Sequence, residues 1–284
     1  MLHRRALILC AILALTCLPA TAADSTIKID SATFGGLSAR AIGPAVMSGR
    51  ISAIDAVATD PVTVWMGTAS GGVWVSKNAG VSFNPVFDDH TQSIGAITVD
   101  PSEPETVWVG TGETWVRNSV SVGDGVYRTT DGGDNWEHLG LENTERIAKI
   151  AVDPSDGDTV FVCATGQLWS SNEERGVFKT TDGGTTWEKI LYVDEGTGCA
   201  DLDMDPQEPR ILYAAMWEFQ RYPDFFNSGG PGSGLYRSTD GGENWVELTK
   251  GLPEGEKGRI ATAIAPSRPA VVYALVEAED TAFY

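Results

Sequence analysis

One short pattern, Ser/Thr-x-Asp-x-Gly-x-x-Trp, recurs along the chain and constrains the fold more than any other feature. Full copies span residues 129–136, 180–187 and 238–245, and a degenerate copy spans residues 76–83. The spacing is roughly 50 residues, a period typical of arrays of similar supersecondary units. Such units bury their apolar faces against one another, so the repeat predicts a modular fold.

A second motif repeats with the same period: an apolar segment that ends in Asp-Pro or a close relative and is followed by a β-rich segment. Its prolines are Pro61, Pro101, Pro154, Pro206 and Pro266. Around the box at 180–187, the pattern predicts strands at 147–152, 159–164 and 176–180, with a fourth beginning at Trp187. Each unit is therefore expected to be a four-stranded antiparallel sheet.

The repeated box predicts a tight turn between the third and fourth strands of each unit. Its acidic residue can accept hydrogen bonds from backbone N–H groups, its glycine supplies a positive φ, and its tryptophan is expected to pack under the hairpin. In the first copy, Asn78 and Phe83 preserve this logic. The structural box residues are therefore Asn78, Asp131, Trp136, Asp182, Trp187, Asp240 and Trp245.

Repeated four-stranded antiparallel sheets are the blades of a β-propeller, and the sequence between the strands lacks helical periodicity. The predicted fold class is all-β: four full blades and the start of a fifth, with the ring incomplete in this chain. The blades are expected at 49–88, 94–140, 147–192, 199–250 and, in part, 258–284. Residues 23–48 are a candidate closing strand, and the remaining blades are expected from a longer parent chain.

The box is identified as the Asp-box, or BNR repeat. From about residue 40 onward, the sequence resembles secreted Asp-box propellers related to sortilin-type domains and to xyloglucanase-like glycoside hydrolases. The second resemblance implies glycoside hydrolysis, with one catalytic Asp in a Thr-Asp-x-Gly-Gly segment. The matching segment, residues 68–72, has Ala69 at that place. A methyl group cannot transfer a proton, so this departure counts against the implied activity.

The first 22 residues have the order of a secretory signal peptide. Arg4 and Arg5 precede an apolar run over residues 6–18, and small residues follow at 20–22. The run is shorter than the about 20 apolar residues that a membrane-spanning helix needs, and no later segment predicts a span. The sequence therefore predicts export, to the periplasm or the medium.

Charge and cysteine content limit the partners and the compartment. The formal net charge is −19. Nucleic acids and anionic lipids both attract basic surfaces, so neither is a predicted partner. Removal of the signal peptide would leave two cysteines, Cys163 and Cys199. An oxidising compartment permits a disulfide between them, and two buried free thiols are the alternative.

Successive turns of an up-and-down blade alternate between its two ends, so the loops between second and third strands share one rim. Three of them, residues 111–124, 165–175 and 216–233, are long and hold one tryptophan each. Aromatic rings with polar neighbours suit sugar rings or extended peptides. The candidate ligand-binding residues are Trp115, Arg117, Trp169, Trp217, Arg221 and Tyr222. The alternative is that the tryptophans only plug the loops against the blades.

Glycoside hydrolysis needs two carboxyl groups, and Glu113 and Glu218 are the candidate catalytic pair on these loops. A second acidic group alternates along one strand: Asp201, Asp203 and Asp205. Because Pro206 stands where a calcium loop would have glycine, no metal is predicted, and no cofactor motif is present. The sequence thus predicts an exported module that binds a glycan or a polypeptide. The alternatives are a xyloglucanase-like glycoside hydrolase and a scaffold or assembly role.

Overall fold

The computed structural model describes residues 50–57, 59–279 and 282–283. The predicted signal peptide (1–22) and the candidate closing segment (23–48) lie outside the described residues. Apart from one 3₁₀ turn, η2 (Glu142–Thr144), every regular element in the described ranges is a β-strand. Within those ranges, no helix has the length and apolar character needed to cross a membrane.

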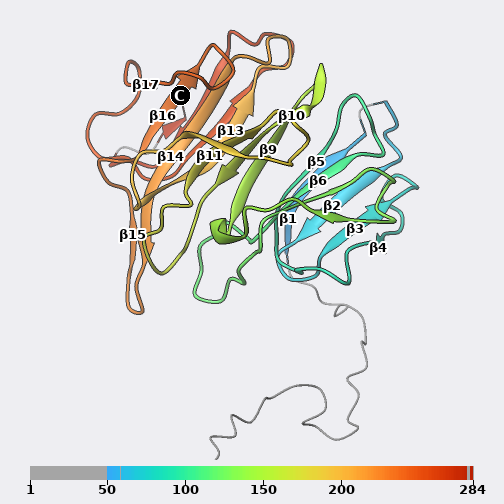
Figure 1. Cartoon of the computed structure of the whole chain (residues 1–284). Coiled ribbons are helices and arrows are strands. Elements are labelled where there is room, and N and C mark those ends of the chain that lie inside the picture. Colours follow the sequence, from blue (N-terminus) through green and yellow to red (C-terminus); the bar gives the residue numbers. More distant parts are fainter. Residues whose placement is uncertain (1–49, 58, 280–281, 284) are drawn as a thin grey trace, which may run out of the picture. The chain divides into compact units, whose positions relative to one another are not determined.

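The strands form successive antiparallel sheets, shown in chain order from blue to red in Figure 1. The first sheet contains β1 (Ile51–Ala56), β2 (Val64–Thr68), β3 (Val73–Ser76) and β4 (Asn84–Pro85). The second contains β5 (Ile94–Val99), β6 (Val107–Thr111), β7 (Val126–Thr129) and β8 (Glu137–His138). The third contains β9 (Ile147–Asp153), β10 (Asp156–Ala164), β11 (Gly176–Thr180) and β12 (Glu188–Leu191). In each sheet, neighbours along the chain are also neighbours in space.

The fourth and fifth sheets follow the same order. The fourth contains β13 (Thr197–Met204), β14 (Leu212–Arg221), β16 (Gly234–Ser238) and β17 (Val246–Leu248), and β15 (Phe226–Ser228) pairs with the end of β14. The fifth contains β18 (Ile260–Ile264), β19 (Val272–Val276) and β20 (Ala282–Phe283). The predicted all-β propeller is confirmed: the described residues form four blades of at least four strands and a fifth of three.

The apolar cores lie between consecutive sheets. Aromatic residues at the same place in the second strand of successive sheets, Trp65, Trp108 and Phe161, are almost completely buried. Trp65 packs with Ile97 and other residues of the second sheet, and the same pattern continues from sheet to sheet. Each sheet therefore buries its faces against its neighbours, as a repeat unit without its own core must do.

The box turns are held by a regular set of hydrogen bonds. In the second blade, the Thr129 hydroxyl donates to Asp131 Oδ1 (2.7 Å), and the Asn135 backbone N–H donates to the same oxygen (2.9 Å). The degenerate first copy has the same pattern around Asn78. There Ala79 lies at φ 57°, in the left-handed region that glycine occupies in the full copies.

The box tryptophans pack against the preceding blade, which corrects the expectation that each packs under its own hairpin. Trp136 belongs to the core between the first and second sheets, and its indole N–H donates to Val86 O (2.7 Å). Trp187 repeats this arrangement one blade later, with a bond to Leu139 O (2.7 Å). The indole N–H of Trp245 instead donates to Gly242 O of its own box (3.0 Å).

The box carboxylates are the basis of a prediction on acid stability. The pKa of Asp131, Asp182 and Asp240 is lowered to about 2, first by a side-chain hydrogen bond from the residue four positions later, then by its backbone N–H. Because the folded-state pKa lies below the ordinary value of 3.8, the ionised carboxylates stabilise the fold at pH values above 3.8. This contribution is lost as the pH falls toward 2.

Replacing the three aspartates together by asparagine should therefore lower the free energy of unfolding at pH 6, and the difference from wild type should shrink between pH 4 and pH 2. Urea unfolding at a series of pH values measures this difference. All other carboxylates titrate in both the wild type and the variant, so their effect on the free energy of unfolding cancels in the difference between the two proteins. A difference that stayed constant down to pH 2 would contradict the assignment.

The two turn types of each blade share one rim. The box glycine Gly132 donates its N–H to Glu105 O (3.0 Å) in the turn between the first two strands of the same sheet. Gly183 and Gly241 form the equivalent bonds to Asp158 O and Arg210 O. The loops between second and third strands therefore lie at the opposite rim.

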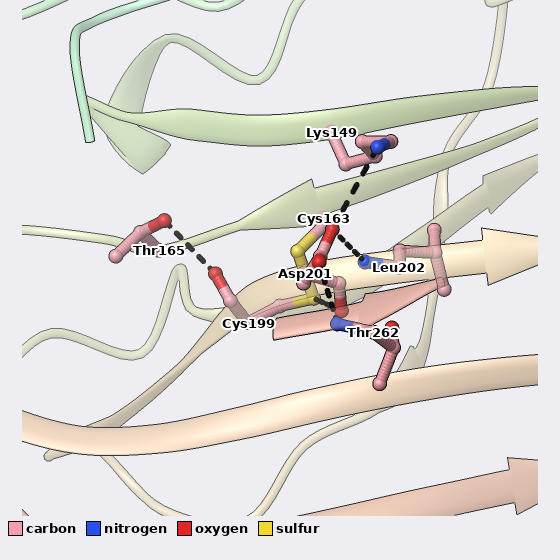
Figure 2. The surroundings of a disulfide bond; sticks show 7 residues. All are labelled: Lys149, Cys163, Thr165, Cys199, Asp201, Leu202 and Thr262. Carbon is pink, nitrogen blue, oxygen red and sulfur yellow. Dashed lines mark hydrogen bonds and ion pairs between the residues drawn. A yellow bond between two sulfur atoms is a disulfide. The ribbon is translucent and has the colours of Figure 1, made fainter. Parts of the chain in front are cut away.

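A disulfide joins the third and fourth blades (Figure 2). Cys163 on β10 and Cys199 on β13 are fully buried and bonded, with 5.1 Å between their Cα atoms. Beside the bond, the Asp201 carboxylate accepts from the Thr262 backbone N–H (2.9 Å) and lies 3.8 Å from Lys149 Nζ. The first strand of the fourth blade is thus tied to the blades on both of its sides. Of the two thiol states left open by the sequence, the structure has the bonded one.

The disulfide closes a loop of 36 residues, for which loss of chain entropy in the unfolded state predicts a stabilisation of about 4 kcal/mol. The double variant Cys163→Ala/Cys199→Ala should therefore unfold at a lower urea concentration. Peptide mapping without reductant should recover one linked peptide that contains both cysteines. Free thiols at both positions in the unreduced protein would contradict the bond.

Candidate ligand-binding site

A cavity of about 660 Å³ opens at the rim opposite the box turns. Its lining comes from distant segments: residues 50–52, residues 115–117, Trp217, Phe226 and Ser228 of the fourth blade, and Arg259 and Glu277 of the fifth. Most of the lining is apolar, with a few charged groups among the rings. This combination is the usual form of a small-ligand site. We refer to it as the rim cavity.

The guanidinium of Arg259 lies between two tryptophans of the rim cavity. Its central carbon is 5.1 Å from the ring centroid of Trp115 and 5.2 Å from that of Trp217. Its Nη1 donates to Thr114 O (3.2 Å). Burial lowers the pKa of Arg259, and the charges of Asp201 and Glu277 oppose that shift. Cation–π contacts with two aromatic rings and the bond to Thr114 O hold this cation at the cavity.

Glu277 brings a carboxylate to the rim cavity. Its Oε2 accepts from the Ser228 hydroxyl (2.8 Å) and from the Arg259 backbone N–H (2.8 Å). The position follows from the pairing of β18 with β19, which sets residue 259 opposite residue 277. Sequence reasoning missed both Arg259 and Glu277. The available signal was the period of the repeat, which places the two ends of this strand pair at the same rim as the long loops.

Trp217 is part of the rim cavity, but not as a loop residue. Residues expected to form a loop at 216–233 instead extend β14 to Arg221 and turn back through β15. Trp217 is only 1% exposed, stacks on Phe219 with ring centroids 4.4 Å apart, and donates its indole N–H to Ser228 Oγ (3.1 Å). Its role in the structure is therefore to form the floor beneath Arg259. Trp115, in contrast, is 58% exposed.

Neither candidate catalytic glutamate lines the rim cavity. Glu113 is 2% exposed and forms an ion pair with Arg50. Glu218 points into its own hairpin, where its Oε2 accepts from the Gly232 N–H (2.9 Å). Ala69, at the place of the Asp expected from the resemblance, is buried, and its N–H donates to Arg50 O (3.0 Å). Both carboxylates therefore hold the rim loops in place.

Three other candidates form a surface outside the cavity lining. Trp169 is 47% exposed, and its carbonyl accepts from Gln220 Nε2 (3.4 Å). Tyr222 stacks on Phe225 with centroids 4.3 Å apart. The guanidinium of Arg221 lies 5.8 Å from the ring of Phe226, itself a lining residue. The structure thus brings Trp115, Arg117 and Trp217 together in the cavity lining. Trp169, Arg221 and Tyr222 lie outside that lining.

Arg175 supports the rim from beneath, a role that sequence reasoning did not assign to it. It is fully buried, with Nη1 donating to Gly196 O (2.8 Å) and Nη2 to Gln167 O (2.7 Å) and Ser170 O (3.0 Å). Burial lowers its pKa to about 10. The loop 165–175 is therefore closed around an arginine that satisfies its carbonyl groups.

The acidic strand residues serve the fold. Asp201 accepts from two backbone N–H groups, and Asp205 accepts from those of Gln207 (2.8 Å) and Glu208 (3.2 Å) in the turn after β13. Burial and the charge of Asp201 raise the pKa of Asp203. Over the described ranges, no cluster of three or more His, Cys, Asp or Glu side chains could hold a metal ion.

Comparison with models of protein families shows the family to which the chain belongs. The family model "Sortilin-Vps10: Sortilin, neurotensin receptor 3" matches residues 71–193 and again residues 124–257. The two overlapping matches together cover more than half of the chain, and the chain belongs to the Sortilin-Vps10 family. The double match, displaced by about one blade, reflects the repeat.

Curated relatives and solved structures extend this result. A xyloglucanase from a Paenibacillus species is 24% identical over 208 residues, covering 65% of this chain and 19% of the relative. A probable oligoxyloglucan-reducing end-specific xyloglucanase from Neosartorya fischeri is 28% identical over 152 residues, covering 50% and 17%. This chain therefore spans about a fifth of the length of these relatives.

Solved structures show the same fold. An ancestral GH74 enzyme superposes with a TM-score of 0.61 at 21% identity, covering 84% of this chain and 30% of that structure. The GH74 xyloglucanase from Xanthomonas campestris gives a TM-score of 0.54 at 18% identity, covering 79% and 34%. The propeller fold of this chain is thus related to that of GH74 enzymes.

Proposed function

We propose that this protein is an exported propeller module that binds a glycan chain in the rim cavity. The observation that carries the proposal is Trp115, which keeps 58% of its surface exposed at the cavity although Arg259 lies over its ring. Exposed indole faces stack on the C–H faces of sugars, and such exposure costs free energy when nothing covers the ring.

Polar groups of suitable kinds surround this ring. Arg117 and Arg259 supply hydrogen-bond donors, and Glu277 supplies an acceptor. The cavity volume of about 660 Å³ falls in the range of ligand pockets. Relatives named as xyloglucanases support a glycan ligand. The polypeptide ligand predicted beside the glycan, and the scaffold or assembly role, stay predictions.

Hydrolysis is the alternative function, and the geometry supports it less well. Two carboxyl groups must flank the scissile bond, whereas Glu277 is the one carboxylate in the cavity lining of the described residues. Glu113 and Glu218 are engaged in bonds that hold loops. Their catalytic roles stay predictions, which release of reducing sugar by wild type and by Glu113→Gln and Glu218→Gln variants would test.

The binding proposal predicts the effect of one substitution. In a titration with the best-bound member of a panel of neutral and acidic oligosaccharides, Trp115→Ala should weaken binding about tenfold, or about 1.4 kcal/mol. Loss of the stacking face is the cause. Isothermal titration calorimetry measures the affinity, and thermal unfolding verifies that the variant is folded.

Two further variants sharpen this experiment. Tyr273→Ala removes a ring that is 43% exposed on β19 but does not line the cavity, so it should leave the affinity unchanged. Trp169→Ala separates the two tryptophan surfaces: a loss equal to that of Trp115→Ala would show that the ligand does not depend on the rim cavity. The absence of binding to every oligosaccharide would overturn the proposal.

Export is part of the proposal, and the buried disulfide supports it because such bonds persist in oxidising compartments. When the protein is expressed in a bacterial host with its own leader, the mature form should be found outside the cytoplasm. N-terminal sequencing should begin at Ala23, after the predicted cleavage site. A cytoplasmic protein that keeps Met1 would contradict export.

A further inference from the structure

The charge of the rim cavity is opposite to that of the chain as a whole. The chain carries a formal charge of −19. Three arginines nevertheless line the cavity, Arg50, Arg117 and Arg259, against the single carboxylate of Glu277 within the described residues. An acidic protein that gathers arginines at one concave surface attracts anions there and repels them elsewhere.

Two of these arginines form no ion pair with any residue that the structure describes. Arg50 forms an ion pair with Glu113. Neither Arg117 nor Arg259 has a carboxylate within ion-pair distance in the part of the chain that the structure describes. Glu277 lies beyond ion-pair distance of the Arg259 guanidinium: its Oε2 accepts from the Ser228 hydroxyl and from the backbone N–H of Arg259, and its charge acts on the guanidinium at longer range.

Burial lowers the pKa of Arg259, and the charges of Asp201 and Glu277 offset that shift only in part. A bound anion at the guanidinium would recover more of the free energy that its burial costs. Its central carbon lies 5.1 Å from the ring centroid of Trp115 and 5.2 Å from that of Trp217, and its Nη1 donates to Thr114 O (3.2 Å), so the guanidinium is held at the cavity. A carboxylate is an anion whose oxygens match the N–H donors of a guanidinium.

We infer that the ligand of the rim cavity is an acidic glycan, in which a uronate carboxylate binds Arg259 and Arg117 while a sugar ring stacks on Trp115. This inference rests on the proposed glycan-binding function and narrows its ligand class. A neighbouring groove carries Glu254, Glu256 and Glu279 and shares Glu277 with the cavity lining. Its negative charge repels the carboxylate, which confines the acidic unit to the arginine side.

The test compares matched ligands by isothermal titration calorimetry. Uronate oligosaccharides (oligogalacturonate and hyaluronan fragments) are titrated beside their carboxyl-reduced, neutral forms. We expect the uronates to bind at least tenfold more tightly, and the preference to fall severalfold in 0.5 M salt. Arg117→Gln and Arg259→Gln should each reduce the affinity for uronates about tenfold more than they reduce the affinity for the neutral forms, because only the uronates lose a charged partner.

A matched variant separates local from overall charge. Arg210→Gln removes the same charge from an exposed turn at the opposite rim, and it should change the affinity for uronates less than twofold. An equal loss in this variant would overturn the assignment to Arg117 and Arg259. Should Arg259→Gln fail to fold, exposed Arg117 still provides the test, because its side chain is not part of the core.

The outcomes also distinguish the two proposals. Neutral forms that bind as tightly as uronates would overturn the inference and leave the glycan-binding function standing. If neither the uronates nor their neutral forms bind, and no member of a wider glycan panel binds, the proposed glycan-binding function itself is overturned. A sulfated oligosaccharide without carboxylates that binds as tightly as the uronates would overturn the choice of carboxylate as the recognised group.

Discussion

The packing of each box tryptophan against the preceding blade is the interaction on which the rest of this structure depends. Trp136 and Trp187 each insert a ring into an intersheet core and donate an indole N–H to the main chain of the preceding sheet. Because each indole N–H bonds to a main-chain oxygen of the preceding sheet, the hydrogen bond constrains the spacing of the two sheets in addition to the apolar contact. The tight box turn is what points the ring in this direction, so local turn chemistry determines the assembly of blades.

The rim cavity is a consequence of this assembly. Thr114 and Arg259, which share a hydrogen bond there, are 145 residues apart in the chain. Their contact requires that the intervening blades keep their order and spacing. The site is therefore a product of the whole stack, and a substitution deep in an intersheet core can change it without touching any lining residue.

Much of the fold is predictable from the sequence because its determinants are local. The box and the β-rich segments define β11 at the predicted residues 176–180, and β10 starts at Asp156 instead of 159 because the preceding turn is tighter than expected. The segment around Trp217 shows where prediction of the fold from the sequence failed. Residues 216–233 were expected to form a loop, whereas Trp217 and Glu218 pair with β13 and residues 219–221 pair with β15, so the strand depends on both partner strands.

The candidate site is less predictable for a related reason. Trp115 and Arg117 lie on a long loop, which marks them as candidates, whereas Arg259 and Glu277 flank ordinary strands. Their importance comes from contacts with Trp115, Trp217 and Ser228, which no local pattern encodes. Glu113 is a candidate by its residue type and its loop, and the structure places it outside the cavity lining, paired with Arg50.

The covalent link between Cys163 and Cys199 limits where this array can give way. The disulfide between the third and fourth sheets has to be reduced before these two sheets can separate. Separation must then occur at one of the other, noncovalent junctions. The rim cavity draws residues from the first and second blades on one side of the bonded pair, from the fourth blade within it and from the fifth on the other, so its lining extends across the covalently linked pair.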